Sequence, residues 1–327
     1  MPLDLVVGAS GFIGSHLVDA LLGEGRTVRA LLRPTSSLKW LPDDDIEILR
    51  VSPWNHQAFT SALRGVDTVY LVAGITHATT KSAFFDFHSR TTTDLLSTAT
   101  ETESGPRRII VFSSLAAAGP SREGRPLMES DTPRPVSWYG ESKLEQERIA
   151  LSFRDRRHVT VLRPPAVYGP RDNDLLQFFR IVKRGFYPAP GGGRGMQSLT
   201  HVADVIRGTL QAARADIPSG RVYFIGTHEI VTWNEIARRV ADHFAKSPVG
   251  IPIPPRIIPF LGLIVQCIAG ITRKRYPLDR NKAMEGRYLH WVCSSARAEN
   301  ELGFRASVPI SEGISTTLDW YRHQNML

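Results

Sequence analysis

Short apolar runs alternate along the first half of the chain with longer stretches in which apolar residues recur at helical spacing. Such runs, separated by amphipathic helices, indicate strands that are buried on both faces of a parallel sheet. Repeated strand–helix–strand units predict a doubly wound α/β fold. The predicted strands are 5–7, 28–32, 46–51, 68–72, 109–112 and 159–162, and the clearest helices are 12–22 and 139–153.

The pattern changes after Arg163, where prolines and glycines at 164–165, 169–170 and 191–193 mark loops. We therefore expect a core of residues 1–165 and a smaller C-terminal lobe of residues 166–327, with a segment near 196–232 returning to the core. Ligand sites should lie between this lobe and the strand ends. The second half is predicted to contain helices 202–213, 233–244 and 310–321 and a strand at 222–225.

Composition and cysteine usage are those of a globular protein in a reducing compartment. Of the 327 residues, 42% are hydrophobic and 22% charged. The two cysteines, Cys267 and Cys293, provide neither a disulfide framework nor a metal-ligand spacing, so we expect no metal. Met1 leads directly into an apolar strand. We therefore expect no signal peptide and a cytoplasmic location.

A glycine motif lies between the first predicted strand and the first helix, where residues 8–14 read Gly-Ala-Ser-Gly-Phe-Ile-Gly. Gly8 allows a tight turn, Gly11 lets a pyrophosphate approach the backbone, and Gly14 lets the helix pack on the strand. The helix N-terminus offers amides to the phosphates. A tightly packed structural turn is the alternative. We predict a dinucleotide site with the binding residues Gly8, Ser10, Gly11, Phe12, Ile13 and Gly14.

The end of the second strand distinguishes the two nicotinamide cofactors, because an acid there accepts the ribose hydroxyls of NAD whereas arginine pairs with the 2′-phosphate of NADP. The residue is Arg33, and Ser36, Ser37 and Lys39 follow it. We favour NADP over NAD, the alternative being that Arg33 is a solvated loop residue. The net charge of +8 would also attract an anionic ligand, although a generally basic surface explains it equally well.

Candidate chemistry follows the fifth strand and opens the next helix. Tyr139 and Lys143 are four residues apart and share a helical face. A nearby ammonium should lower the pKa of the Tyr139 phenol, so that it exchanges a proton with an alcohol or a carbonyl. Ser114 ends a strand where open α/β folds bind ligands, and it is expected to hold the substrate oxygen. The alternative for Tyr139 and Lys143 is a helix-surface pair.

Together these motifs resemble those of the extended short-chain dehydrogenases, also called the NAD-dependent epimerase/dehydratase family, over nearly the whole chain. The resemblance implies a Rossmann core for dinucleotide binding, a substrate-binding C-terminal lobe and a homodimer. It also implies that Ala73 and Gly74 line the path of the adenosine diphosphate, and that Pro164, Ala166 and Val167 border the nicotinamide. The matching segments are 8–14, 73–74, 113–114, Tyr139 with Lys143, 163–170 and 200–204.

Two positions depart from the family pattern. Relatives usually have Gly-Asp after the third strand, whereas this chain has Val51-Ser52-Pro53. They usually have asparagine in the helix after the fourth strand, where this chain has His88. His88 is either a proton relay or substrate contact, or a plain helix histidine, and the latter is favoured.

Within the family, three segments of this chain, 28–34, 287–291 and 301–304, resemble those of the branch that contains 3β-hydroxysteroid dehydrogenases and dihydroflavonol-type reductases. We therefore predict an NAD(P)-dependent oxidoreductase that interconverts a hydroxyl and a carbonyl on an apolar small molecule by hydride transfer. One alternative is a nucleotide-sugar epimerase or dehydratase. Such epimerases commonly have an arginine where this chain has residues 197–199, and Arg194 would replace it. A more remote one is a catalytically silent cofactor-binding regulator. No reader motif or aromatic-interleaved basic run suggests nucleic-acid binding.

The stretch from Ile251 to Ile271 is apolar but interrupted by four prolines, so its unbroken part is too short to span a membrane. We expect a helix that lines the pocket or packs the lobe. The other interpretation is an apolar channel that touches a membrane, helped by Arg273, Lys274 and Arg275.

Overall fold

A seven-stranded parallel sheet forms the centre of the computed structural model, which describes residues 2–42, 45–102, 105–272 and 280–327, with the backbone alone at 266–272 and 280. The strands lie in the order β10-β6-β5-β4-β1-β2-β3. From β1 the chain adds β2 and β3 on one side and β4, β5 and β6 on the other, and such a switch point between β1 and β4 creates a ligand crevice. All seven strands lie within two residues of their predicted ends. They are β1 Leu3–Val7, β2 Thr27–Leu32, β3 Ile46–Arg50, β4 Val66–Leu71, β5 Arg108–Phe112, β6 His158–Arg163 and β10 Arg221–Phe224.

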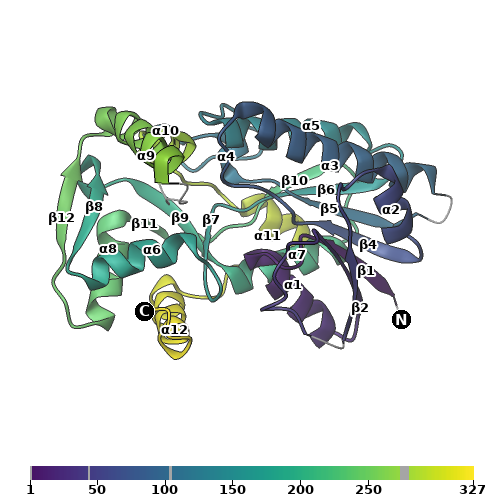
Figure 1. Ribbon diagram of the computed structural model, residues 1–327, viewed down its shortest axis with the longest axis horizontal. Helices are drawn as coiled ribbons and strands as arrows, with labels where there is room; N and C mark the ends of the chain where they lie inside the picture. The colour runs from purple at the N-terminus through teal and green to yellow at the C-terminus, as the bar shows by residue number, and fades with distance from the viewer. Residues whose placement is uncertain (1, 43–44, 103–104, 273–279) are drawn as a thin grey trace.

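Helices cover both faces of this sheet (Figure 1), which confirms the predicted doubly wound α/β fold. One face packs against α1 Phe12–Gly23, α7 Val202–Arg214 and α11 Ala296–Leu302 through a buried cluster that includes Leu17, Val205 and Leu302. The other packs against α2 His56–Ala62, α3 Lys81–Glu101 and α5 Trp138–Ser152. The short helix α4 Leu115–Ala118 follows β5.

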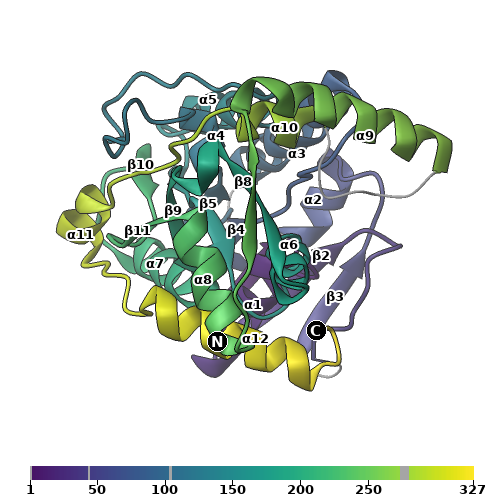
Figure 2. The same cartoon turned by 90° about the vertical axis from the view of Figure 1, so that its left-hand side faces the viewer.

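A second lobe lies beyond the carboxyl ends of the strands (Figure 1). It has a third apolar core around Phe179, Ile236 and Tyr321. Figure 2 shows this lobe from its outer side, with α9 along the top and α12 along the bottom. Its strands are β7 Ala166–Tyr168, β8 Phe186–Pro190, β9 Met196–His201, β11 Ile230–Thr232 and β12 Val249–Ile253. Its helices are α6 Asp174–Lys183, α8 Trp233–His243, α9 Ile258–Thr272, α10 Arg280–Gly286 and α12 Ile310–His323, with 3₁₀ turns η1 Gly191–Gly193 and η2 Pro255–Ile257.

The second half of the chain contributes to both regions. The helix α7 and the strand β10 belong to the central sheet and its cover, whereas β9, just before α7, pairs with β7 and β11 in the lobe. The apolar stretch from 251 onward forms part of β12, η2 and α9. Among the described residues, no helix has the length and apolar character needed to cross a membrane. Arg273, Lys274 and Arg275 lie outside the described residues.

Candidate active site

A cavity of about 510 Å³ lies at the carboxyl ends of the central strands. The turn between β1 and α1, the ends of β2, β4, β5 and β6, and the start of α5 all contribute to its wall. It therefore brings together the glycine motif, Arg33 and the Ser114, Tyr139 and Lys143 set, which are far apart in the sequence. The lining residues from the predicted sites are Gly8, Ser10, Gly11, Phe12, Ile13, Gly14, Arg33, Ser36, Ala73, Gly74, Ser114, Tyr139, Lys143, Pro164 and Val167.

The glycine turn has the backbone that the motif predicts. Gly8 has φ +92°, and a Cβ there would lie 2.7 Å from the Cα of Ala73, in the loop after β4. A Cβ at Gly14 would collide with the Gly8 carbonyl oxygen. The N-cap residue of α1, Gly11, has no side chain that caps the helix. The first amides of α1 are therefore left for a ligand at the cavity wall.

Arg33 and Ser36 line the cavity beyond the end of β2, whereas Ser37 and Lys39 do not. The loop that carries these residues is held in a tight conformation. Arg50 at the end of β3 donates to the carbonyl oxygens of Pro34 and Ser36 at 2.7 and 3.2 Å. Lys39 lies instead over the ring of Trp40, at 4.2 Å from its centroid. Ala166 is exposed and also absent from the lining.

Ser114 and Tyr139 meet where β5 and α5 approach each other. Ser114 is the N-cap of α4, and its Oγ accepts a hydrogen bond from the Ala116 amide at 3.1 Å. Tyr139 is the second residue of α5, whose start is capped by Ser137. The Tyr139 phenol interacts with the Ser114 hydroxyl. Two oxygen-bearing side chains thus share one wall of the cavity.

Lys143 lies one helical turn further along α5 and is almost completely buried. Its Nζ donates to the carbonyl oxygen of Phe112 at 2.8 Å and to Oε1 of Gln146 at 2.9 Å. A Cβ at Gly74 would lie only 3.3 Å from this Nζ. The ammonium therefore lies directly beneath the backbone of the loop after β4.

Burial controls the proton affinities of both groups. Desolvation raises the pKa of Tyr139 above its usual value, the Ser114 hydroxyl lowers it in part, and the charges of Glu285 and Asp174 raise it further. Desolvation lowers the pKa of Lys143 to about 7, against an opposing effect of Glu147. We predicted that Lys143 lowers the pKa of Tyr139, but Lys143 is not among the groups that shift this pKa, and its ammonium donates to Phe112 and Gln146.

His88 links the loop after β4 to α5. Its Nε2 accepts a hydrogen bond from the Ile75 amide at 3.2 Å, so Nδ1 carries the proton and donates to Ser142 Oγ at 2.9 Å. Ser142 Oγ in turn donates to the Tyr139 carbonyl oxygen at 2.8 Å. Desolvation, with a smaller effect of the Lys143 charge, lowers the pKa of His88 to about 2. His88 is therefore a neutral structural residue and does not line the cavity.

A buried ion pair joins α5 to the end of β6. Arg163, at the end of β6, donates to both carboxylate oxygens of Glu147 at 2.8 and 2.6 Å. Both side chains are at most 5% exposed. The Ser113 hydroxyl donates to the same carboxylate. This pairing fixes α5 against the strand ends that carry Ser114.

Two groups of lining residues were not identified from the sequence. Trp54 and Phe87 form an aromatic pair with ring centroids 5.8 Å apart, from the loop after β3 and from α3. On the lobe side, Asp172 accepts the Asp174 and Leu175 amides and so begins α6. Asp174 pairs with Lys282 of α10 at 2.7 Å. Trp54 and Phe87 come from separate segments, so no local spacing in the sequence indicates that they meet, whereas Asp172 and Asp174 are close in sequence at the start of one helix.

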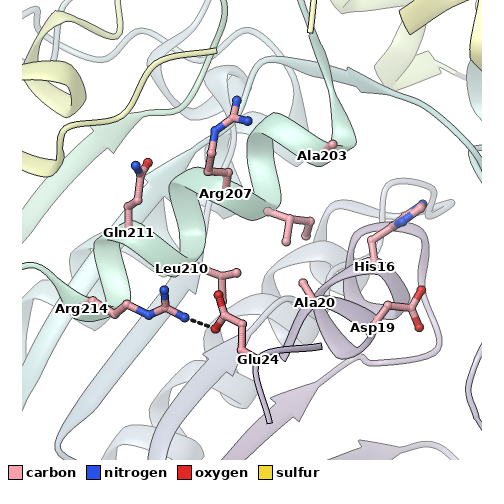
Figure 3. A pocket seen from close by; sticks show the side chains of 10 residues that line it. His16, Asp19, Ala20, Glu24, Ala203, Arg207, Leu210, Gln211 and Arg214 are labelled. Carbon is pink, nitrogen blue, oxygen red and sulfur yellow. Dashed lines mark hydrogen bonds and ion pairs between the residues drawn. The ribbon is translucent and has the colours of Figure 1, made fainter. Parts of the chain in front are cut away.

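A second hollow of about 630 Å³ lies between α1 and α7 (Figure 3). Its apolar lining residues include Ala20, Ile206 and Leu210. An ion pair between Arg214 and Glu24 lies at one end. It shares no lining residue with the cavity at the strand ends. It therefore contains none of the predicted site residues.

Comparison with known proteins identifies what this site resembles. The model of the NAD dependent epimerase/dehydratase family matches residues 5–226. A ceramide reductase of Caulobacter vibrioides is 28% identical, covering 97% of this chain and 93% of the relative. A 3-beta-hydroxysteroid dehydrogenase of Mycolicibacterium neoaurum is 24% identical, covering 97% and 90%.

A solved structure, MoeE5 in complex with UDP-glucuronic acid and NAD, superposes with a TM-score of 0.77 at 27% identity, covering 98% of this chain and 99% of MoeE5. The relatives thus include both enzymes named for lipid substrates and one bound to a nucleotide sugar. This chain and MoeE5 share the Rossmann-type fold.

Proposed function

This chain belongs to the NAD-dependent epimerase/dehydratase family, and we propose that it reduces a carbonyl on an apolar small molecule, with Tyr139 as the proton donor. Its membership makes it a nicotinamide-dependent enzyme of the dehydrogenase, reductase or epimerase type. The observation that supports reduction is the contact between Ser114 and Tyr139 at the cavity wall. The Tyr139 phenol is protonated at neutral pH, and a carbonyl oxygen placed beside the two hydroxyls would accept a hydrogen bond from Ser114 and a proton from Tyr139.

When bound, a reduced nicotinamide cofactor supplies a hydride to the carbonyl carbon. In the proposed mechanism Ser114 donates a hydrogen bond to the carbonyl oxygen and Tyr139 transfers its phenolic proton to that oxygen as the C–O π electrons move onto it. Lys143, one helical turn further along α5 at the cavity wall, would hydrogen-bond the nicotinamide ribose. A solvent proton restores Tyr139 for the next turnover.

The charges around the cavity favour an apolar substrate over a nucleotide sugar. Among the described residues that line it, the cations are Arg33, Lys143 and Arg171. Arg33 lies at the cofactor end, Lys143 is buried beneath Gly74, and Arg171 pairs with Asp19 at 2.8 Å. Arg194, which was considered as a diphosphate ligand, is not in the lining. A ceramide reductase and a steroid dehydrogenase among the relatives support the same choice.

We propose that NADP is preferred over NAD. Arg33 is exposed at the cavity wall, where its guanidinium is available for a 2′-phosphate, and the Arg50 hydrogen bonds hold its loop in shape. The Arg33→Asp variant should bind NADPH at least about tenfold more weakly, because it loses a charge-assisted hydrogen bond. Arg122→Asp makes the same charge change at an exposed site outside the lining and serves as the control. Unchanged NADPH affinity in Arg33→Asp would exclude this role.

The remaining site assignments also belong to the proposal. Gly8, Ser10, Gly11, Phe12, Ile13 and Gly14 would hold the pyrophosphate, and Ala73, Gly74, Pro164 and Val167 would border the rest of the cofactor. Trp54 and Phe87 offer an apolar wall near Val51-Ser52-Pro53, where relatives usually have an acid. Residues 1–165 would chiefly bind the cofactor and residues 166–327 the substrate, in a homodimer. Light scattering tests the dimer.

The experiment is an NADPH-oxidation assay with a panel that includes a ceramide-like ketone, a steroid ketone and UDP-glucose. Turnover of a lipophilic ketone with cofactor consumption is the expected result. Tyr139→Phe should lower kcat by about 10²–10⁴-fold while NADPH still binds. Conversion of the nucleotide sugar without net cofactor consumption would contradict the reductase proposal and establish the epimerase alternative.

A further inference from the structure

Exposed apolar side chains are concentrated on one part of the lobe. Of the nine large ones among the described residues, six follow one another along β12, η2 and α9. In Figure 1, β12 forms the outer edge of the lobe and leads up to α9. We call these six side chains the docking face: Val249, Ile251, Ile257, Phe260, Leu263 and Ile264.

The helix α9 is two-sided where its side chains are described. Ile258 and Gly262 are buried, and Ile258 lies against Gly286 of α10. Phe260 and Leu263, by contrast, are 64% and 47% exposed. Residues three and four apart share a helical face, so Phe260, Leu263 and Ile264 form an apolar stripe that α10 does not cover.

The charge around this face identifies its occupant. Arg256 and Lys246 are exposed beside the apolar residues. From residue 243 to 272 the chain has two Lys or Arg, which are these two residues, and no Asp or Glu. A twofold contact between two copies of this face would bring two surfaces of the same positive charge together, which is unfavourable. A partner surface with both apolar and anionic groups would match the apolar side chains and the basic residues of the docking face.

Over its described residues α9 is too short for a span, and its length fits a surface position. Fifteen residues make a helix of about 22 Å, shorter than the roughly 30 Å apolar core of a bilayer. We propose that the docking face lies in the interface of a membrane that contains anionic lipid, with Phe260 and Leu263 among the acyl chains and Arg256 at the phosphates.

The position of α10 connects this surface to the cavity. Asn281 of α10 accepts the Trp138 amide of α5 at 3.1 Å, and Glu285 accepts the Ser137 hydroxyl at 2.6 Å. The helix α10 thus separates the docking face from Tyr139 by a single layer. A lipophilic substrate would enter from the membrane beside α10, and this last step rests on the proposed reductase function.

The test is flotation of the full chain with vesicles of phosphatidylcholine, with and without phosphatidylglycerol. Wild type should float with the anionic vesicles. The Phe260→Ser/Leu263→Ser variant should partition at least about tenfold more weakly, because two apolar side chains no longer insert. Arg256→Glu should lose affinity for the anionic vesicles. Met128→Ser is the matched control, since Met128 is 48% exposed but lies elsewhere.

Wild type that remains unbound in the presence of anionic vesicles would overturn the proposal, as would an equal loss in Met128→Ser. A wild-type oligomer that the Phe260→Ser/Leu263→Ser variant dissociates would instead assign the face to a second copy. Reduction of a short, water-soluble ketone is measured in parallel. Flotation without any ketone turnover would support membrane docking and refute the reductase function. Ketone turnover without flotation would support the reductase function and refute membrane docking.

Discussion

Replacing His88 by leucine tests whether this residue holds the cofactor loop against α5. The variant keeps an apolar side chain of moderate size but removes the acceptor for the Ile75 amide and the donor to Ser142. Ser142 keeps its bond to the Tyr139 carbonyl, so the principal loss is the partly buried Ile75 amide. An unsatisfied group of this kind costs about 1–3 kcal/mol. For a chain of this size we expect the melting temperature to fall by roughly 4 °C.

The loop that His88 anchors includes Gly74, which lines the cavity above Lys143. We therefore expect His88→Leu to weaken NADPH binding as well as stability, and His88→Gln, which retains an acceptor and a donor, to restore much of both. Thermal melts and fluorescence titration with NADPH measure the two effects. Coupling with Ser142→Ala in a double-mutant cycle would support the network. Melting within 1 °C of wild type and unchanged NADPH affinity in His88→Leu would refute this reasoning.

Three further outcomes follow from the structure. Gly14→Ala should reduce NADPH affinity by at least about tenfold, measured by titration, because its Cβ collides with the Gly8 carbonyl oxygen. Arg163→Met should lower the free energy of unfolding in urea by about 3–5 kcal/mol, because it leaves Glu147 buried without its partner; a loss below 1 kcal/mol would contradict this. Folded His88 stays neutral, whereas the unfolded residue gains a proton below about pH 6.5. Wild type should therefore lose about 1 kcal/mol relative to His88→Gln between pH 6.5 and 5.5, in urea melts at both pH values.

Local sequence was sufficient to predict the central sheet and the glycine turn. The buried strands are short apolar runs between helices, and Gly8, Gly11 and Gly14 act through their own backbone and immediate neighbours. The order of Ser114, Tyr139 and Lys143 along the chain also predicted that they share a wall, because strand ends and the following helix starts meet at one edge of a parallel sheet.

Local sequence could not indicate where distant segments hold a side chain. Of Arg33, Ser36, Ser37 and Lys39, all expected at the cavity, only Arg33 and Ser36 line it, in a loop that Arg50 of the neighbouring strand holds. Lys143 was expected to act on the Tyr139 phenol, yet burial determines both pKa values. No spacing in the sequence indicates which carbonyl a buried ammonium meets.

The contacts between α10 and the core explain how the lobe can influence the chemistry. The helix α10 bonds to Ser137 and Trp138, the two residues just before Tyr139, and through Lys282 to Asp174 of α6. Glu285 and Asp174 are also the two charges that raise the Tyr139 pKa. Any substrate or surface that displaces α10 therefore changes both the position of the start of α5 and the electrostatic potential at the phenol. The position of the start of α5 and the proton affinity of Tyr139 are thus linked through the same helix.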